Sequence, residues 1–400
     1  MHHWLRHLIV VLTVALAPLS AYGDVRFEFG MLGGYTGNLL KDSSQLSDSY
    51  VSRRVSIDLY PVSMARINLL GENAGYRDVS ALGSLLYGGG VTLIPTGDSS
   101  RISLYLAATA MARDFRGSDS AFRTGEFNSS DYTATASLGY QVSQSMSLRL
   151  GYTYRSIGYS HEEVRSKIDH DIIAGVNLSF LGANSLDLEG GYTQGNLDYL
   201  WAWQTIPGID TLLPRGRIKA DSAYAWLDEG ELNSVYVSPR FSRPLGDRTG
   251  LSVALSHRSF TNRDPEALIY GYSTGYLSPW VQSYEGNALL VTMKSYLIPR
   301  LIVSGGFGYW DRSFLDVIEA KPRVDPGTGD TALIVTALNN IQKRNDDRRQ
   351  AFVYFQLPLP PQSGFTAEAT LRLEYTSNSS SVVVYDYTDF SATAGVRFRF

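Results

Sequence analysis

The chain has 400 residues, with 35 Lys and Arg against 39 Asp and Glu, so its formal net charge is −4. This balance predicts no nucleic-acid partner, since nucleic-acid binding depends on a basic surface. The absence of cysteine excludes disulfide bonds, thiolate metal ligands and a Cys-x-x-Cys-His haem attachment site in this chain. Apolar residues make up 44% of the sequence, yet beyond residue 23 no apolar run is long enough for a transmembrane helix.

Residues 1–23 have the organisation of a cleaved secretory signal. Arg6 precedes an apolar stretch from Leu8 to Leu16, and Ala21-Tyr22-Gly23 places small residues three and one positions before a cleavage site. An N-terminal membrane anchor is the alternative, but the apolar stretch is short for a membrane span. We therefore expect export of the chain, with residues 24–400 forming a single mature domain.

In most of residues 24–400, apolar and polar residues alternate in recurring segments of about ten residues. In the segment 145–155, for example, Leu148 and Leu150 fall on one face and Arg149 falls on the other. The same alternation recurs in residues 51–60, 101–113 and 365–375. A period of two places successive residues on opposite faces of a β-strand. The sequence therefore predicts an all-β protein whose strands each have one apolar face.

The connections between these segments alternate between short and long. The short ones lie at 61–63, 95–99, 143–145, 181–184, 244–247, 298–299 and 358–363. The long ones lie near 37–48, 74–79, 114–130, 160–167, 197–230, 262–283, 313–347 and 377–386. Together they join about 16 strands, with 14 or 18 as alternatives. We assign the short turns, together with both ends of the domain, to the periplasmic side and the long loops to the extracellular side.

The C-terminal segment carries the most specific signal. Its apolar residues Ala392, Ala394, Val396, Phe398 and Phe400 alternate with Thr393, Gly395, Arg397 and Arg399. This ending resembles the C-terminal signature of bacterial outer-membrane β-barrels, the porin-like superfamily. The resemblance implies an up-and-down antiparallel barrel in the outer membrane, in contact with lipid and lipopolysaccharide. It also implies that Phe398 and Phe400 form an assembly signal read by the barrel-assembly machinery.

A soluble β-sandwich or propeller is the alternative fold. Such folds bury their apolar faces and rarely need long alternating strands over the whole chain. They also leave the Phe-terminated last strand unexplained. A membrane barrel explains both features, because closing the last strand on the first leaves no unpaired backbone group in the hydrocarbon.

If the apolar face meets lipid, the polar face lines the lumen. The candidate lumen-lining residues are Arg54, Asp58, Arg66, Arg101, Arg149, Arg155, Asp171, Asp187, Glu189, Arg258, Glu368, Arg372, Glu374, Arg397 and Arg399. Arginine outnumbers the carboxylates in this set, which predicts a mild preference of the pore for anions. The alternative is that these residues pair with one another and only brace the wall.

Two long loops have unusual content. Residues 197–230 include Trp201, Trp203 and Trp226, and residues 313–347 contain a segment, Thr331–Gln342, with apolar residues at helical spacing. We predict a short helix over Thr331–Gln342, with Asp330 as its N-cap. Either loop would constrict the lumen if it folded inward; the alternative is that both lie outside, packed on lipopolysaccharide or on each other.

Few residues suit catalysis. Asp169-His170-Asp171 is one candidate, and His257-Arg258-Ser259 is loosely similar to the outer-membrane phospholipase motif, in which His and Ser stand two residues apart. That family continues with Asn-Gly, whereas Phe260 and Thr261 follow here. We predict a protein that is not an enzyme and has neither a cofactor nor a metal site.

Function is less constrained than fold. A barrel in which nearly every residue belongs to a strand, turn or loop is typical of a porin-like channel that passes ions or small solutes by diffusion. The alternatives are a sheath for a partner, such as a multihaem cytochrome of an electron conduit or an exopolysaccharide export system, and less favourably an outer-membrane hydrolase or an adhesin.

Overall fold

A computed structural model describes most of the chain beyond residue 23. The described residues are 24–39, 45–96, 100–115, 128–159, 166–180, 183–198, 230–263, 284–298, 300–314, 344–361, 364–381 and 385–400, together with the backbone of four short strands at 200–203, 224–227, 318–324 and 331–337. The predicted secretory signal lies outside these residues, as do parts of most of the long loops.

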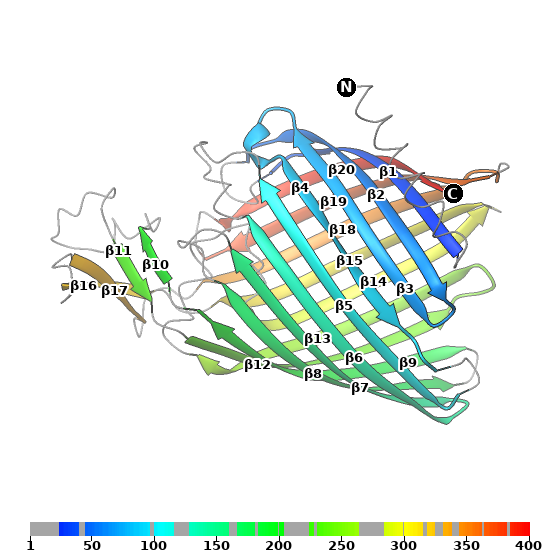
Figure 1. Cartoon of the computed structure of the whole chain (residues 1–400), viewed down its shortest axis with the longest axis horizontal. Helices are drawn as coiled ribbons and strands as arrows, with labels where there is room; N and C mark the ends of the chain where they lie inside the picture. The colour runs from blue at the N-terminus through cyan, green and yellow to red at the C-terminus, as the bar shows by residue number, and fades with distance from the viewer. Residues whose placement is uncertain are drawn as a thin grey trace.

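Sixteen antiparallel strands close into one barrel (Figure 1). They are β1 (Asp24–Thr36), β2 (Asp48–Val62), β3 (Ala65–Tyr76), β4 (Ser84–Leu93), β5 (Ile102–Phe115), β6 (Ser129–Ser143), β7 (Met146–Tyr159), β8 (Lys167–Phe180), β9 (Asn184–Leu197), β12 (Gly230–Pro244), β13 (Thr249–Arg263), β14 (Tyr284–Ile298), β15 (Leu301–Phe314), β18 (Asn345–Pro358), β19 (Thr366–Ser380) and β20 (Tyr387–Arg399). Each strand pairs with its neighbour in the chain, apart from two interruptions in the long loops, and β20 pairs with β1. The predicted fold class and strand number are confirmed.

Short turns join the strands at one end of the barrel. Two residues, Ser63 and Met64, connect β2 to β3, and another two, Gln144 and Ser145, connect β6 to β7. The connection from β12 to β13 contains Gly246 at a φ of +115°, a left-handed conformation that glycine adopts without steric cost. These tight connections fix the register of each hairpin. Both barrel termini lie at this end, which we call the periplasmic end.

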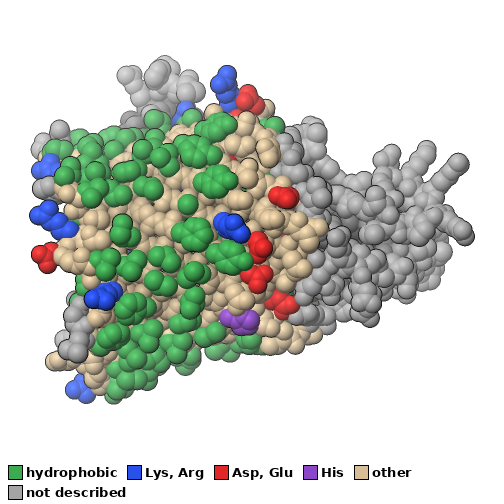
Figure 2. Space-filling model, turned by 180° about the vertical axis from the view of Figure 1, so that it is seen from behind, with side chains coloured by type: hydrophobic (Ala, Val, Ile, Leu, Met, Phe, Trp, Pro, Cys, Tyr) green, Lys and Arg blue, Asp and Glu red, His purple; other side chains and the backbone are tan. Residues whose placement is uncertain are grey.

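The outer face of the barrel is apolar. Leu138, Leu150 and Ile172 have exposed fractions of 48%, 55% and 53%, and Figure 2 shows many hydrophobic side chains spread over one side of the barrel wall. A continuous apolar band of this kind is unfavourable in water and matches the hydrocarbon of a bilayer. Within the described residues, no helix is long and apolar enough to cross a membrane.

The seam between the first and last strands is fastened at both ends. At the periplasmic end, the Phe400 backbone N–H donates to the Phe27 carbonyl at 2.9 Å, and the Phe27 N–H donates to the Phe400 carbonyl at 3.2 Å. At the opposite end, the buried Asp389 carboxylate accepts from the Thr36 hydroxyl at 3.0 Å and the Asn38 backbone N–H at 2.9 Å. Between these ends, β1 and β20 pair continuously from Glu28 opposite Arg399 to Thr36 opposite Ser391, so neither backbone edge is open at the seam.

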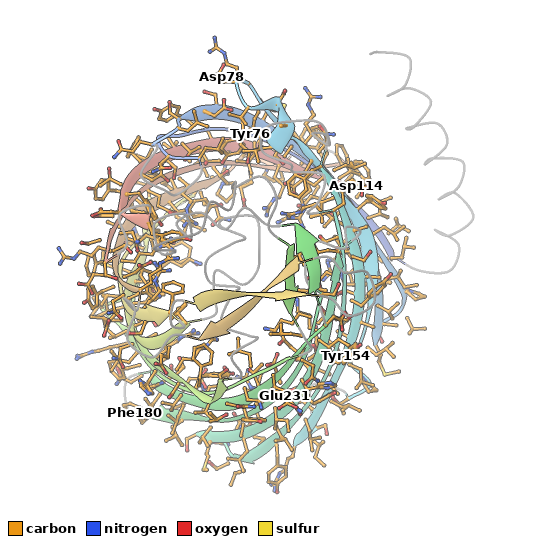
Figure 3. The ribbon with its side chains drawn as sticks, turned by 90° about the vertical axis from the view of Figure 1, so that its left-hand side faces the viewer. Tyr76, Asp78, Asp114, Tyr154, Phe180 and Glu231 are labelled. Atoms are coloured by element: carbon orange, nitrogen blue, oxygen red, sulfur yellow. The ribbon has the colours of Figure 1, made fainter. Side chains whose placement is uncertain are left out.

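Two of the long loops pair with each other. β10 (Leu200–Trp203) and β11 (Tyr224–Leu227) belong to the first, and β16 (Ile318–Val324) and β17 (Thr331–Ala337) belong to the second. They form a four-stranded sheet of order β10-β11-β17-β16, in which β11 and β17 are parallel. The sheet stands beyond the ends of the barrel strands in Figure 1 and within the barrel outline in the view of Figure 3. The described strands of the two loops therefore lie outside the barrel and pair with each other, rather than folding into it.

The predicted helix over Thr331–Gln342 is wrong where the structure describes it. Residues 331–337 form β17, and residues 338–342 lie outside the described part of the chain. The segment contains the β-branched residues Thr331, Ile334, Val335 and Thr336, which favour strands. Its backbone pairs with β16 on one side and β11 on the other, so pairing with neighbouring strands outweighs the apolar spacing of the segment itself.

Candidate functional site: the inner wall of the barrel

The predicted lumen residues share the inner face. In each strand they alternate with the apolar residues of the outer face, as Arg149 does between Leu148 and Leu150, which are 38% and 55% exposed. The register preserves this face from strand to strand, so that Asp58 lies opposite Asn68, and Glu189 opposite Gly175. Fourteen of the fifteen candidates lie on barrel strands; Arg101 lies in the bend that precedes β5.

Charged pairs run along this wall on β2, β3, β6 and β7. Both Asp58 carboxylate oxygens accept from Arg66 at 2.9 Å, and Asn68 adds a third hydrogen bond to Asp58 at 2.6 Å. Arg155 pairs with Asp131 at 2.5 Å. Each pair joins strands that are neighbours in the barrel, so the charges stay on the wall instead of bridging the lumen.

A second group lies between β7 and β12. Arg149 pairs with Glu189, which also accepts a hydrogen bond from the Tyr236 hydroxyl at 2.9 Å. On the other side of the barrel, Arg372 pairs with Glu374 at 2.6 Å. The partners Asp131 and Tyr236 are absent from the sequence-based set. The alternation within β6 and β12 would have placed both on the inner face.

The seam carries a third group. Glu28 accepts from Arg399 at 2.9 Å and pairs with Arg397 at 3.2 Å, and Arg397 also lies 4.0 Å from Glu368. Glu28 was absent from the predicted set, although the alternation of residues 24–29 would have placed it on the inner face. The group links β1, β19 and β20 on the lumen side of the closing strand.

The inner charges are in contact with solvent. The side chains of Arg66, Arg149 and Arg372 are 46%, 50% and 48% exposed although all three lie inside a closed barrel. Side chains in a packed interior would be close to fully buried. The lumen is therefore wide enough for water at these positions. Solvated pairs contribute only about 0–1 kcal/mol each to stability.

Some candidates form no ion pair. Within the described residues, the side chains of Arg54, Asp171 and Asp187 make none. The Arg258 guanidinium lies 5.9 Å from the centre of the Tyr284 ring. The described inner wall thus combines paired and unpaired charges. It therefore fits neither a pore lined only by free charges nor a wall whose charges are all paired for bracing.

Inward aromatic side chains lie flat against the wall over glycines. A Cβ on Gly191 would lie 2.4 Å from Cε1 of Tyr236, and one on Gly34 would lie 2.6 Å from the Tyr50 ring. Gly306 faces the Phe352 ring in the same way at 2.8 Å. Because the rings lie along the wall, they leave the centre of the lumen open.

A buried polar cluster occupies the end of the barrel opposite the short turns. Asp346, with a fully buried side chain, binds Arg312 at 3.2 Å and Arg344 at 2.6 Å. Arg312 also donates to the Asn378 side-chain carbonyl at 2.7 Å, and the Arg344 guanidinium lies 3.9 Å from the centre of the Phe314 ring. The cluster holds together β15, β18 and β19 where the loop 315–343 leaves the barrel.

The histidine candidates lie on the outer face. His170 shares a hydrogen bond of 2.8 Å with the Tyr152 hydroxyl, while Asp169 and Asp171 occupy the opposite face of β8. His257 lies 2.9 Å from the Asn287 side-chain oxygen, on the face that also carries Leu255. His170 therefore does not share a face with Asp169 and Asp171, and His257 and Ser259 both lie on the outer face. Among the described residues, no group of three or more His, Asp or Glu has the geometry to hold a metal ion.

Comparisons with known proteins extend to the fold alone. No family model and no curated protein matches the chain. A crystal structure of Acinetobacter baumannii OccAB1 is similar to it, with 11% identity, a TM-score of 0.49 and coverage of 94% of this chain and 97% of that one. The outer membrane protein OpdK from Pseudomonas aeruginosa gives 12% identity, a TM-score of 0.46 and coverage of 94% and 99%. CdiB from Acinetobacter baumannii gives 10%, 0.48, and coverage of 94% and 60%.

The features of the molecule itself decide its class. They are a closed ring of sixteen antiparallel strands, an exposed apolar outer face, a solvated polar inner face and a hydrogen-bonded seam. Only a closed barrel satisfies every backbone group of a β-structure in lipid. The protein is a sixteen-stranded β-barrel of the outer membrane.

Proposed function

We propose that the protein is a porin-like channel that lets ions and small polar solutes diffuse across the outer membrane. The observation that carries the proposal is the half-exposed state of charged side chains on the inner wall, such as Arg149 and Arg372. A wall that holds water beside fixed charges is suited to the passage of hydrated solutes. Ion pairs with Glu189 and Glu374 hold these two side chains at the wall and out of the diffusion path.

The outer face and the seam define the proposed partners of the barrel. Lipid and lipopolysaccharide would cover the apolar wall, and the barrel-assembly machinery would recognise Phe398 and Phe400 of the closing strand. A cytochrome or an export component inside or beside the barrel belongs to the alternative function, in which the barrel is a sheath.

Conductance of the purified protein in planar bilayers tests the proposal. We expect stepwise insertion of open channels with a linear current–voltage relation. In a salt gradient, we expect a mild preference for anions, because arginines outnumber carboxylates among the candidate lumen residues. Folded, inserted protein that carries no current would contradict the channel and favour the sheath.

A further inference from the structure

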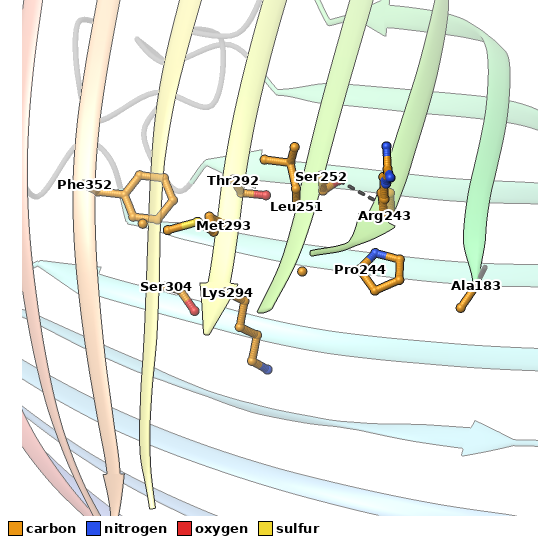
Figure 4. A pocket seen from close by; sticks show the side chains of 13 residues that line it. Ala183, Arg243, Pro244, Leu251, Ser252, Thr292, Met293, Lys294, Ser304 and Phe352 are labelled. Carbon is orange, nitrogen blue, oxygen red and sulfur yellow. Dashed lines mark hydrogen bonds between the residues drawn. The ribbon is translucent and has the colours of Figure 1, made fainter. Parts of the chain in front are cut away.

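A groove crosses the inner wall near the periplasmic end, over β12, β13, β14 and β15. Its volume is about 490 Å³, within the range of small-molecule sites. Figure 4 shows the residues that line it. The inference below rests on the proposed channel function and concerns the solute that the channel holds.

The register explains why the groove exists. One row of inward positions runs through Ser242, Ser252, Thr292 and Gly306 to Phe352. A second row, two residues nearer the periplasmic end, runs through Pro244, Gly250, Lys294 and Ser304. Between them lies a row of outward-facing residues, Arg243, Leu251, Met293 and Gly305, whose backbone forms the floor. Gly250 and Gly306 contribute no side chain that would fill the space.

The lining has one sign of charge. Lys294 is exposed and is the only inward-facing charged residue among those that line the groove. Its register partners are Gly250 and Ser304, and none of the inward-facing residues described on β13, β14 and β15 is an acid. No ion pair of Lys294 occurs within the described part of the chain. Its ammonium nitrogen lies 5.7 Å from the centre of the Tyr296 ring, a neutral group that leaves the positive charge uncompensated and accessible to a bound anion.

The remaining polar groups are hydroxyls. Ser242 donates to Ser252 at 3.2 Å, and Thr292 and Ser304 add two more hydroxyls on the two sides of the groove. A hydroxyl both donates and accepts hydrogen bonds, so this set can exchange bonds with the hydroxyls of a solute. The Phe352 ring lies over Gly306 at one end and supplies an apolar surface.

We propose that the groove is a binding subsite for a small hydroxylated anion, such as a sugar acid or a sugar phosphate. Lys294 binds the anionic group, and the hydroxyls of Ser242, Ser252 and Thr292 bind the hydroxyls of the solute. Because the ammonium group is a point charge with three hydrogen-bond donors, it can bind either a carboxylate or a phosphate.

Solute block of single-channel current tests the subsite in the full-length protein. Gluconate and glucose 6-phosphate supply the two anionic groups, glucose lacks the charge, and acetate lacks the hydroxyls. We expect gluconate, glucose 6-phosphate or both to interrupt the current at lower concentration than glucose or acetate. Equal block by glucose would contradict the role of charge, and equal block by acetate would contradict the role of the hydroxyls.

Variants assign the effect to the groove. Lys294→Gln should raise the blocking concentration by roughly tenfold, as expected for one lost charge-assisted hydrogen bond, and Lys294→Arg should restore part of the affinity. Arg243→Gln removes the same charge from the outer face of the groove floor and should leave the block unchanged. A Ser252→Ala/Thr292→Val variant should weaken block by gluconate without changing block by acetate.

The outcomes separate the two proposals. Open channels whose block is the same in Lys294→Gln and wild type would overturn the subsite and leave the channel in place. Absence of current in the wild type would overturn the channel itself. Retained heat-modifiable migration of each variant on gels shows that its barrel is folded.

Discussion

Replacing Asp346 with alanine is expected to lower the free energy of unfolding by about 3–5 kcal/mol, the usual cost of removing one partner from a buried ion pair. The side chains of Arg312 and Arg344 are only 6% and 9% exposed, and both bind this one carboxylate. Without it, two guanidinium groups stay buried with no counter-charge. Denaturant unfolding of the barrel in detergent or lipid vesicles measures the change.

Asp347→Ala is the matched control. Asp347 is the next residue of β18, but it is exposed and accepts a hydrogen bond of 2.9 Å from the Tyr309 hydroxyl on the outer face. We expect its loss to cost less than about 1 kcal/mol. Similar costs for the two substitutions would show that the buried cluster does not stabilise this end of the barrel.

Phe400→Ala should greatly reduce the amount of assembled barrel. The Phe400 ring lies 5.8 Å from Phe27 and 5.7 Å from Phe365, centre to centre, at the point where the closing strand meets the first strand. Alanine keeps the backbone hydrogen bonds of the seam but removes this aromatic contact and the terminal residue of the proposed assembly signal. The heat-modifiable barrel in outer-membrane fractions measures assembly.

Phe180→Ala provides the comparison for the seam. Phe180 ends β8 and stacks on Phe241 at 6.3 Å, so the substitution removes an aromatic pair of the same kind away from the seam. We expect its assembly to remain close to that of the wild type. Phe400→Ala barrels that do insert should conduct normally, because the ring is not part of the inner wall. Equal assembly of the two variants would argue against a special role for the closing strand.

The fold was predictable because its main signal is local. Alternation in segments such as residues 145–155 fixes the two faces of a strand, and the lengths of the connections fix the order of turns and loops. Phe400 then identified the seam. None of these inferences needs the position of a distant residue, so one sequence was enough for the strand number and the closure.

The candidate site was only partly predictable, because its pairs depend on register between distant residues. Arg149 and Glu189 were both placed on the inner wall, but their contact joins residues 40 positions apart. The buried contact of Arg312 with Asn378 spans 66 positions and left no signal in either segment. The error at residues 331–337 has the same origin, since the partner of β17 on one side comes from another loop.

We propose that the inner wall of the barrel faces water and lines the conduction path. The reaction of single cysteines with a charged reagent tests this proposal most directly. The natural chain has no cysteine, so each substitution introduces the only thiol. Ser137 faces the lumen, and its neighbour Leu138 is 48% exposed on the outer face. In planar bilayers, a charged, membrane-impermeant methanethiosulfonate reagent should react with Ser137→Cys and lower its single-channel current, and it should leave Leu138→Cys unchanged. Reaction at Leu138→Cys without reaction at Ser137→Cys, or reaction at Ser137→Cys with no change in current, would contradict the account.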